Sequence, residues 1–374
     1  MKVVSILGTR PEIIKMSRVM AVLDKYTDHT VVHTGQNYDY ELNQLFFEDL
    51  GIRKPDYFLQ AAGKTAAETI GLVIAKSDGV LAEIRPDAVL ILGDTNSSLA
   101  ALPAKRRRIP VFHMEAGNRC FDDRSPEEIN RRIVDHISDI NMPYSSISRE
   151  YLLREGLAPD RIVKTGSPMY EVLHYYLPRI QQSDVLVRLE LKPRQYFIVS
   201  CHREENVDKQ RELERFVALL NSLSAEYGLP IVVSTHPRTR KRLNELGILL
   251  SPEVQLRDPL GLFDFVQLEM NAKATLSDSG TITEESSILG FPALNLREMH
   301  ERPEGMEEGA VMMTGFDVAR VRDGLRILAD QSDAQLRTVQ EYQVSNVSQK
   351  VLRIILSYVN YVQRNVWHEC APNI

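Results

Sequence analysis

Residues 113–132, HMEAGNRCFDDRSPEEINRR, combine side chains that can hold and move protons. Ten of these twenty residues are ionisable, namely one histidine, five carboxylates and four arginines. The segment follows RRIPVF, which is typical of the start of a buried strand. Carboxylates at the end of such a strand can act as general acids and bases. The cluster is therefore a candidate proton-transfer site wherever helix capping does not account for its charges.

The run Ser125-Pro126-Glu127-Glu128 predicts the first turn of a helix. Ser125 suits the N-cap, Pro126 the first helical position, and Glu128 the third position of a capping box. Capping thus accounts for Glu128 and leaves Glu127, which the positive helix end should hold ionised. The helix is predicted to continue with an apolar stripe at Ile129, Ile133, Ile137 and Ile140.

Other carboxylates are predicted to end strands. Glu115 ends the strand before this helix, Asp94 ends the strand of LGDT (92–95), and Asp278 ends a strand in the second half of the chain. In open α/β sheets the ligand binds beyond the carboxyl ends of the strands. We therefore expect Asp94, Glu115 and Glu127 to form a proton-handling cluster on the first domain.

The segment GTRPEIIK (8–15) predicts an anion site at a helix N-terminus. Thr9 and Glu12 fit a capping box, and Pro11 suits the first helical turn. Capping leaves Arg10 and Lys15, a basic pair close to the free N–H groups of the helix. The alternative is that both are ordinary surface residues.

The segment SDSGTITEESSILG (277–290) predicts a phosphate-binding turn. Thr281 and Glu284 fit another capping box, while Ser279 and Gly280 would let backbone N–H groups approach a phosphate. Glu285 is left over and could accept both hydroxyls of a ribose. The alternative is a glutamate that faces solvent.

Two predicted strands of the second half end in His-Arg pairs. His202 lies in VSCHREEN (199–206) and His236 in THPR (235–238), where each could contact a diphosphate or move a proton. A single histidine is more often structural, but the repeated pair favours an anion site. The chain has no HxH or DxD spacing, so we predict no metal.

The elements that position these residues form an alternating pattern. Short Val/Ile/Leu runs separated by helical segments predict parallel strands covered by helices on both faces. The predicted strands are 3–9, 29–35, 87–94, 109–116, 160–166, 196–204, 230–237, 274–280 and 292–298. The pattern restarts near GSP (166–168), which predicts two Rossmann-like domains whose sheets face a central cleft.

The predicted organisation has three parts. Residues 1–167 form the N-terminal domain with the acid–base residues, and residues 168–348 form the domain that binds the nucleotide. Residues 349–374 complete a C-terminal helix that packs back on the first domain. A chain of 374 residues also exceeds what one hydrophobic core usually serves.

Composition excludes several classes of partner. Lys plus Arg is 45 and Asp plus Glu is 51, so the net charge is −6, which argues against nucleic acid. No apolar segment approaches membrane-spanning length, and the N-terminal apolar run is too short for a signal peptide. Three widely spaced cysteines predict reduced thiols and hence a cytoplasmic protein. From the residues alone we infer a nucleotide-sugar enzyme, and both a transferase and an epimerase fit.

A set of motifs narrows this choice. GTRPE, GDT, HMEAG, PEEINR, CHREEN, SDSGTITEE and ERPE, in this order, resemble the non-hydrolysing UDP-N-acetylglucosamine 2-epimerase family from residue 1 to about the end of the chain. The resemblance implies the two-Rossmann-domain architecture called GT-B and interconversion of UDP-sugars at C2. It also implies no NAD, no metal and a homodimer. In the expected mechanism UDP is eliminated to give a bound 2-acetamidoglucal, and is then re-added with C2 protonated on the opposite face.

The resemblance also assigns roles to residues. Asp94, Glu115 and Glu127 match the acid–base carboxylates, and His202 matches the catalytic histidine near the diphosphate. The residues expected to bind substrate or UDP are Arg10, Lys15, Arg119, Arg131, His236, Ser279, Gly280, Glu285 and Arg302.

Two segments depart from the common family pattern. Residues 115–119 read EAGNR where EAGLR is usual, and TGQNYDYEL (34–42) replaces a run that in some bacterial members binds UDP-GlcNAc as an activator. This version is similar to a branch that forms UDP-N-acetyl-L-fucosamine from UDP-2-acetamido-2,6-dideoxy-L-talose for surface polysaccharides. UDP-GlcNAc stays an alternative substrate. The rival functions are a GT-B glycosyltransferase, a hydrolysing epimerase and a nucleotide-sugar sensor without turnover.

Overall fold

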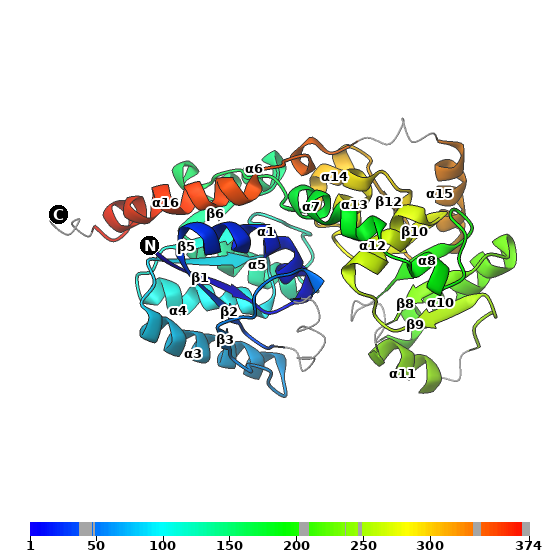
Figure 1. Ribbon diagram of the computed structural model, residues 1–374, viewed down its shortest axis with the longest axis horizontal. Helices are drawn as coiled ribbons and strands as arrows, with labels where there is room; N and C mark the ends of the chain where they lie inside the picture. The colour runs from blue at the N-terminus through cyan, green and yellow to red at the C-terminus, as the bar shows by residue number, and fades with distance from the viewer. Residues whose placement is uncertain are drawn as a thin grey trace. The chain divides into compact units, whose positions relative to one another are not determined.

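The computed structural model describes residues 1–36, 47, 49–201, 209–235, 237–245, 249–331 and 338–368, without the side chains of 237, 238 and 244. The chain divides into two compact units, Met1–Leu173 with Gln343–Ile374, and His174–Tyr342 (Figure 1). The sequence placed the end of the N-terminal domain at residue 167, whereas the first unit extends to residue 173. It therefore includes the first turns of helix α7 (Met169–Gln181). There Glu171 accepts hydrogen bonds from the backbone N–H (2.9 Å) and the hydroxyl of Ser348.

The first unit contains a six-stranded parallel sheet. Its strand order is β3-β2-β1-β4-β5-β6, the order of a Rossmann fold. The strands are β1 (Lys2–Leu7), β2 (Asp28–His33), β3 (Tyr57–Phe58), β4 (Ala88–Leu92), β5 (Val111–Met114) and β6 (Ile140–Met142). Nearly every residue of β1, β4 and β5 is buried, as expected for a sheet that helices cover on both faces.

The helices of the first unit connect and cover these strands. They are α1 (Arg10–Tyr26), α3 (Ala66–Ile84), α4 (Ala101–Arg106), α5 (Pro126–Ile137), α6 (Ser146–Arg154) and the start of α7, with 3₁₀ turns η1 (Asn96–Ala100) and η2 (Pro159–Arg161). The C-terminal helix α16 (Val347–Asn365) lies beside α1 in this unit (Figure 1). It buries the apolar residues Val351, Ile354 and Ile355.

The second unit repeats the same topology. Its sheet has the order β12-β11-β10-β7-β8-β9, so its first strand in the chain, β7, lies beside its fourth, β10. The strands are β7 (Phe197–Ser200), β8 (Ile231–Ser234), β9 (Val254–Arg257), β10 (Ala274–Ser277), β11 (Ala293–Asn295) and β12 (Met312–Met313). The predicted α/β class with two parallel Rossmann-like sheets is therefore confirmed.

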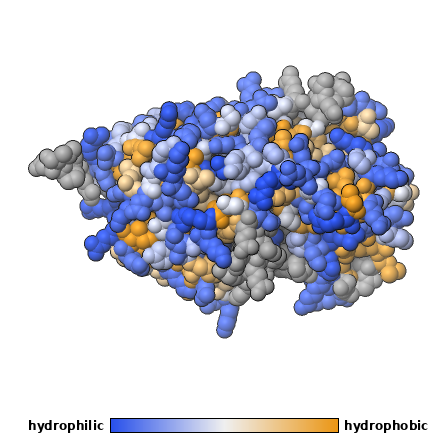
Figure 2. Space-filling model, viewed as in Figure 1, coloured by the Kyte–Doolittle hydropathy of each residue, from blue (hydrophilic) through white to orange (hydrophobic). Residues whose placement is uncertain are grey.

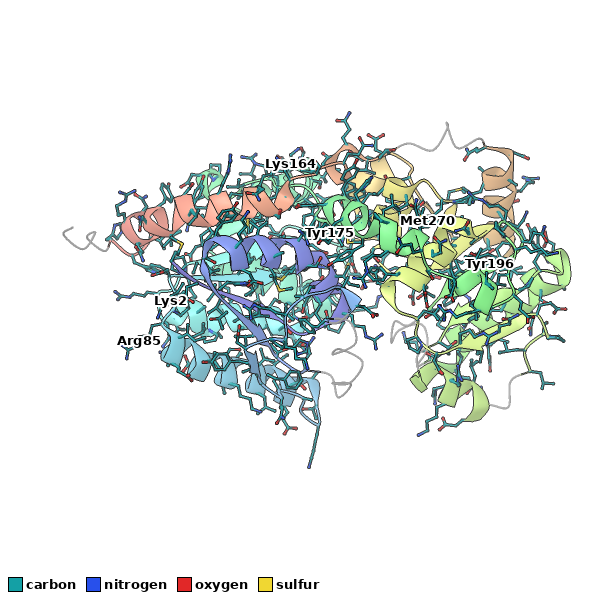
Figure 3. All side chains as sticks on the ribbon, viewed as in Figure 1. Lys2, Arg85, Lys164, Tyr175, Tyr196 and Met270 are labelled. Atoms are coloured by element: carbon teal, nitrogen blue, oxygen red, sulfur yellow. The ribbon has the colours of Figure 1, made fainter. Side chains whose placement is uncertain are left out.

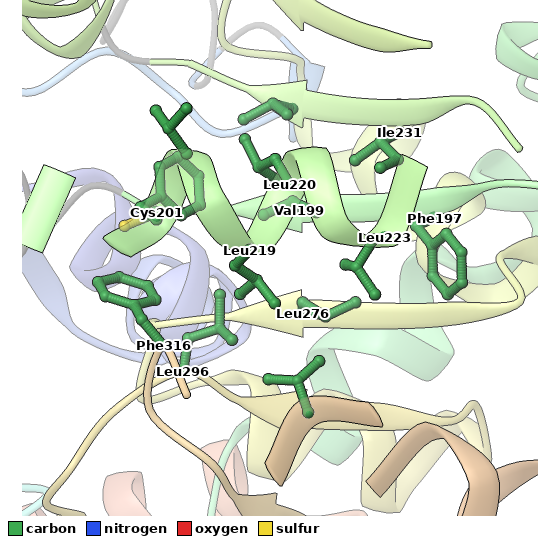
Figure 4. Close-up of a cluster of buried hydrophobic side chains, with 14 of the residues drawn as sticks. Phe197, Val199, Cys201, Leu219, Leu220, Leu223, Ile231, Leu276, Leu296 and Phe316 are labelled. Carbon is green, nitrogen blue, oxygen red and sulfur yellow. The ribbon is translucent and has the colours of Figure 1, made fainter. Parts of the chain in front are cut away.

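The helices of the second unit form its core with these strands. They are α8 (Val185–Arg188), α10 (Gln210–Tyr227), α11 (Pro237–Glu245), α12 (Leu262–Asn271), α13 (Ile282–Leu289), α14 (Pro303–Glu307) and α15 (Val318–Asp330), with the 3₁₀ turn η4 (Gln340–Tyr342). Figure 4 shows Leu219 and Leu223 of α10 over Leu276 of β10. Helix α12 is also linked to this sheet. Tyr196, which directly precedes β7 and is labelled in Figure 3, donates its hydroxyl to the carbonyl of Leu268 in α12 at 2.6 Å.

One predicted strand is wrong. Residues 160–166 form no strand, because η2 occupies their start and Ile162 makes a single bridge to Asn141. The sixth strand of the first sheet is instead β6, which contains Ile140, a residue that the sequence assigned to a helix. The short strands β3, β9 and β12 were not predicted, since none carries a long apolar run.

The predicted apolar face of α5 is also wrong. Ile129 and Ile133 are 52% and 42% exposed. The buried residues of α5 are mainly polar, namely Glu128, Asn130, Arg131, Val134 and Asp135. The helix turns its charged face inward because that face supplies partners to charged groups at the strand ends, as described below.

No described helix is both long and apolar enough to cross a membrane. Hydrophilic residues cover most of the face shown in Figure 2, and hydrophobic residues form scattered patches there.

Candidate active site

The ends of β4 and β5 bring two carboxylates to one edge of the first sheet. The two strands are parallel neighbours with Leu92 opposite Met114. Glu115 directly follows β5, and Asp94 lies two residues beyond β4. This edge also holds the N-terminus of α1, which begins at Arg10 directly after β1 and Thr9. Asp94 and Glu115 thus follow neighbouring strand ends, and Arg10 begins the helix after β1, which are the positions in the fold that the sequence predicted for them.

Asp94 is held by Arg131 of α5. Nε and Nη2 of Arg131 lie 2.7 and 2.6 Å from Oδ2 of Asp94, and Asn130 donates to the Asp94 carbonyl at 2.9 Å. Arg131 is only 4% exposed in its side chain, and its Nη1 lies 3.1 Å from Glu128. Arg131 thus supplies a fixed positive charge to Asp94.

Glu115 is held by Lys15 of α1. The ammonium Nζ lies 2.6 Å from Oε2 of Glu115, and the Tyr144 hydroxyl donates to the same oxygen at 3.1 Å. The Glu115 backbone has φ of +63°, a conformation that is uncommon outside glycine and recurs at functional sites. Lys15 is therefore buried against a carboxylate, whereas the sequence had suggested a lysine open to an anion.

Glu12 lies beside this edge and has an environment that the sequence did not reveal. Its carboxylate accepts from the N–H groups of Gly8 (2.6 Å) and Thr9 (3.0 Å), and from the Thr95 hydroxyl (2.5 Å). Burial raises the pKa of Glu12 to about 7, although these donors lower it, and the charge of Asp94 raises it further. The Glu12 carboxylate thus accepts the hydrogen bond from the Thr9 N–H that the predicted capping box requires. It also binds Thr95, which directly follows Asp94.

Glu127 and Glu128 have different partners from those predicted. Among the described residues, the carboxylate of Glu128 accepts no hydrogen bond from Ser125, and only its backbone N–H donates to the Ser125 carbonyl, at 3.1 Å. It is fully buried and accepts from the N–H groups of Cys120 (3.0 Å) and Phe121 (3.3 Å). Burial opposes ionisation, but the Cys120 N–H and Arg131 outweigh it, so the pKa of Glu128 is lowered.

The Ser125 hydroxyl instead donates to Glu127, at 2.7 Å. The capping prediction failed because the loop at 120–121 presents closer unpaired N–H groups to Glu128 than the helix end does. Glu127 is partly exposed and has no ion pair among those found in the described part of the chain.

Arg119 is buried and forms two ion pairs within the first unit. Its guanidinium lies 2.7 Å from Asp135 and 2.6 Å from Glu155, and the residue is 2% exposed. The guanidinium is thus held by two carboxylates in this structure, and the predicted contact of Arg119 to substrate stays a prediction.

The predicted phosphate-binding turn of the second unit follows β10. The Ser279 N–H donates to the Ser277 hydroxyl at 3.1 Å, and the Ser279 hydroxyl lies 2.9 Å from that of Thr281. The predicted box between Thr281 and Glu284 is absent. Glu284 is fully buried and pairs with Arg302 at 3.1 Å. A carboxylate buried at this position is stabilised more by a cation than by a hydrogen bond from the helix end.

Glu285 lies in the first turn of α13, where it is 8% exposed. Near it is Glu269 of α12, which is 1% exposed and whose two oxygens have no hydrogen-bond partner among the described residues. Burial, and then the charge of Glu285, raise the pKa of Glu269 well above its usual range. Sequence reasoning missed Glu269 because a single glutamate in an amphipathic helix carries no signal of burial.

The two histidine candidates, His202 and His236, lie outside the described residues. Within the described part of the chain, no group of three His, Cys, Asp or Glu side chains could hold a metal ion. One HxxxH spacing occurs in β2, where His29 pairs with Asp24 and His33 stacks on Phe58.

The paired Rossmann-like sheets, with carboxylates at the strand ends of one and a Ser-Gly turn before a helix in the other, define a GT-B-like nucleotide-sugar enzyme. Comparison with known proteins narrows this class. The sequence profile of the family UDP-N-acetylglucosamine 2-epimerase matches residues 22–356. The chain therefore belongs to this family and is an isomerase of the epimerase type.

Individual relatives agree over nearly the whole chain. A structure of UDP-N-acetylglucosamine 2-epimerase from Rickettsia bellii matches with a TM-score of 0.92 and 51% identity, over 99% of this chain and 100% of that chain. The UDP-GlcNAc 2-epimerase of Methanocaldococcus jannaschii, crystallised with UDP-GlcNAc and UDP, matches with a TM-score of 0.89 and 34% identity, over 96% and 100%. The UDP-2,3-diacetamido-2,3-dideoxy-D-glucuronate 2-epimerase of Pseudomonas aeruginosa is 35% identical, over 84% of this chain and 88% of its own length.

Proposed function

We propose that the chain is a non-hydrolysing UDP-N-acetylhexosamine 2-epimerase that inverts C2 by eliminating and re-adding UDP. The observation that carries this proposal is the pair of carboxylates on neighbouring strand ends, each with its own cation. Asp94 pairs with Arg131, and Glu115 pairs with Lys15. Two carboxylates, each paired with its own cation, suit a reaction in which a proton is removed from one face of a carbon and a proton is returned to the opposite face.

The chemistry explains why such a site is needed. The hydrogen on C2 of the sugar is not next to a carbonyl group, so its direct removal is unfavourable. In the proposed path a carboxylate takes the C2 proton, the C–H electron pair forms the C1–C2 double bond, and UDP leaves C1 with the electrons of the C1–O bond. UDP then adds back to C1 while a carboxylic acid protonates C2 on the opposite face. Epimerisation therefore conserves UDP and needs no water.

The acid–base set is proposed to be Asp94, Glu115 and Glu127. Lys15 and Arg131 keep two of these groups charged and in place. His202 is proposed to act near the diphosphate, as the family resemblance implies.

UDP is proposed to bind to residues 168–348. Gly280 suits this placement, because a residue without a side chain lets the backbone N–H groups of the turn approach a phosphate closely. Ser279 and the start of α13 would supply hydrogen-bond donors, and Glu285 would accept the ribose hydroxyls. Arg302, which pairs with Glu284 at 3.1 Å, is proposed as another residue that binds UDP. Arg10 and His236 are proposed as further contacts to the nucleotide.

The native sugar is proposed to be UDP-GlcNAc or its 6-deoxy counterpart, UDP-2-acetamido-2,6-dideoxy-L-talose, for surface polysaccharide synthesis. Relatives in the family are named for different UDP-amino sugars, including a diacetamido glucuronate. Residues 37–42 of the departing segment TGQNYDYEL (34–42) lie outside the described residues.

We also propose a homodimer, in which the exposed apolar residues of α4 and α5 meet a second copy. Leu102, Ile129 and Ile133 are 40%, 52% and 42% exposed, and α4 contacts α5. A neighbouring set of exposed large apolar side chains is typical of an interaction surface.

The proposed function is tested by proton NMR in D₂O with UDP-GlcNAc and, separately, with the 6-deoxy UDP-sugar. Deuterium at C2 of the recovered UDP-sugar, with both epimers present, is the expected result. Release of free sugar and UDP would identify a hydrolysing enzyme. No deuterium with either substrate would contradict the proposal.

A further inference from the structure

A buried ion network lies beneath the two strand-end carboxylates. Nδ1 of His113 lies 3.0 Å from Oδ1 of Asp135, and Nη1 of Arg119 lies 2.7 Å from the other Asp135 oxygen. Arg119 also binds Glu155 with two nitrogens, at 2.7 and 2.6 Å. His113, Asp135 and Arg119 are each 2% exposed or less. His113 and Arg119 thus share the buried carboxylate of Asp135, and the more exposed Glu155 binds the other side of Arg119.

The network holds both turns that carry the proposed acid–base groups. Nε2 of His113 donates to the Gly93 carbonyl at 2.9 Å, directly before Asp94. The Gly117 N–H donates to both oxygens of Asp135 at 3.2 Å, two residues after Glu115. Asp135 and His113 therefore connect the end of β4 to the end of β5.

Both turns contain residues with positive φ angles, so contacts from neighbouring segments are expected to stabilise them. Gly93, Glu115 and Gly117 have φ values of +75°, +63° and +80°. A non-glycine residue such as Glu115 keeps a positive φ only where its surroundings over-determine it. At Gly117 a Cβ would lie 2.4 Å from the Ser148 carbonyl oxygen, so this turn also packs too closely for any side chain.

The surroundings of His113 indicate that its ring carries both protons. Nε2 faces the Gly93 carbonyl. Nδ1 lies 3.0 Å from Oδ1 of Asp135, although the Nδ1–H bond does not point straight at this oxygen. The side chain of Asn141 in β6 also lies against the ring. Burial lowers the pKa of His113, but Asp135, the Gly93 carbonyl and Asn141 outweigh it and raise the pKa overall.

We propose that Asp135 and a protonated His113 are positioning residues, which fix the directions in which Asp94 and Glu115 present their carboxylates to the sugar. The network contacts neither carboxylate directly. It acts through the backbone of the turns on either side of them. This inference rests on the proposed function for the identity of Asp94 and Glu115 as acid–base groups.

The chain offers a matched control for loss of stability alone. Asp139 is 1% exposed, and it also binds β5, but at the opposite end, where it accepts from the Val111 N–H at 3.0 Å and pairs with Lys105. Asp135→Asn and Asp139→Asn therefore each remove one buried charge beside β5. They differ in which end of the strand loses its support.

The test uses three measurements on the full chain. Nitrogen-15 NMR, with His113 assigned from the His113→Gln spectrum, reports the protonation of its ring. Exchange of C2 hydrogen in D₂O reports turnover, and calorimetry with UDP reports nucleotide binding. We expect His113 of the wild-type protein to keep both ring protons to a higher pH than a free histidine does, and His113 of Asp135→Asn to lose one of them at a lower pH than in the wild-type protein.

In the same variant the C2 exchange rate should fall by about 10- to 100-fold, the scale of a misplaced catalytic group, with UDP affinity within about threefold of wild type. Asp139→Asn should keep exchange within about threefold of wild type. If Asp135→Asn does not fold, His113→Gln takes its place in the exchange assay, with the same expected loss.

Three results would overturn the inference. A neutral His113 in the wild-type protein would remove the charge on which it depends. Equal loss of exchange in Asp135→Asn and Asp139→Asn would reduce the network to a stabilising role, and full exchange in Asp135→Asn would remove any role in positioning. A wild-type protein without C2 exchange would instead contradict the proposed function, while the NMR measurement would still report on the network.

Discussion

The ammonium of Lys15 lies 2.6 Å from Oε2 of Glu115, and the two side chains are 5% and 8% exposed. Replacing Lys15 by Met removes the buried ammonium that pairs with Glu115, which should cost about 3–5 kcal/mol of folding free energy. The double variant Lys15→Met/Glu115→Gln should regain much of this loss because it buries no charge. Turnover should be lost in both variants. Urea unfolding and C2 exchange make the two measurements, and a Lys15→Met protein as stable as wild type would show that the pair is not buried in solution.

Glu127 and Glu128 should respond differently to amide substitution. Glu127→Gln should lower C2 exchange by about 100-fold or more, the scale of general acid–base catalysis. Its stability should stay within about 0.5 kcal/mol, as for most surface substitutions. Glu128→Gln weakens charged hydrogen bonds to the 120–121 backbone and to Arg131, so it should lose about 1–3 kcal/mol of stability. Normal exchange in Glu127→Gln would exclude Glu127 from the acid–base set.

Glu285→Ala should weaken UDP binding by about 1–3 kcal/mol, the cost of losing a hydrogen bond to a charged group. The matched control is Glu269→Gln, because burial and the charge of Glu285 raise the pKa of Glu269 and so favour its neutral form, which the amide resembles. Calorimetry with UDP should find the control within about twofold of wild type. Equal weakening in both variants would place the ribose contact elsewhere.

Glu12 should make stability depend on pH. Its pKa is raised from 4.5 to about 7 in the folded protein, so between these values the folded state binds more protons than the unfolded state. The contribution of Glu12 to stability is therefore fully present below about pH 4.5 and is lost as pH rises towards 7. Relative to Glu12→Gln, the wild-type protein should lose about 1–3 kcal/mol between pH 5 and 8.

Chemical unfolding of both proteins across this range measures the difference. His33, whose pKa burial lowers to about 4, contributes the opposite slope, but it is common to both proteins and cancels. A constant difference between wild type and Glu12→Gln would mean that Glu12 is not buried as described.

Ile133→Asp should convert the proposed dimer into a monomer, because it places a charge on the exposed apolar face of α5. Ile327→Asp is the matched control, since Ile327 is 40% exposed on α15 in the second unit and Ile133 is 42% exposed. Light scattering after size exclusion measures the mass of each. A dimeric Ile133→Asp protein would move the interface away from α5.

Several parts of the fold follow from sequence pattern alone. The long Val/Ile/Leu runs of β1, β4, β5 and β7 predicted parallel, doubly covered strands, because such strands bury both faces. Short strands such as β12, with two residues, carry too little pattern to be recognised. The α16 helix was predicted correctly because its apolar residues recur at helical spacing over a long stretch.

The identity of the chain and the positions of its strand-end residues were determined by the sequence, since strand periodicity decides where Asp94 and Glu115 emerge. Which charges pair could be decided only by the tertiary structure. Capping rules assigned Glu128 and Glu284 to their own helix ends, but the folded chain gives them the 120–121 backbone and Arg302. The physical reason is burial, because a charge taken out of water requires a hydrogen-bond or ionic partner, and the folded chain supplies that partner from a loop outside the helix.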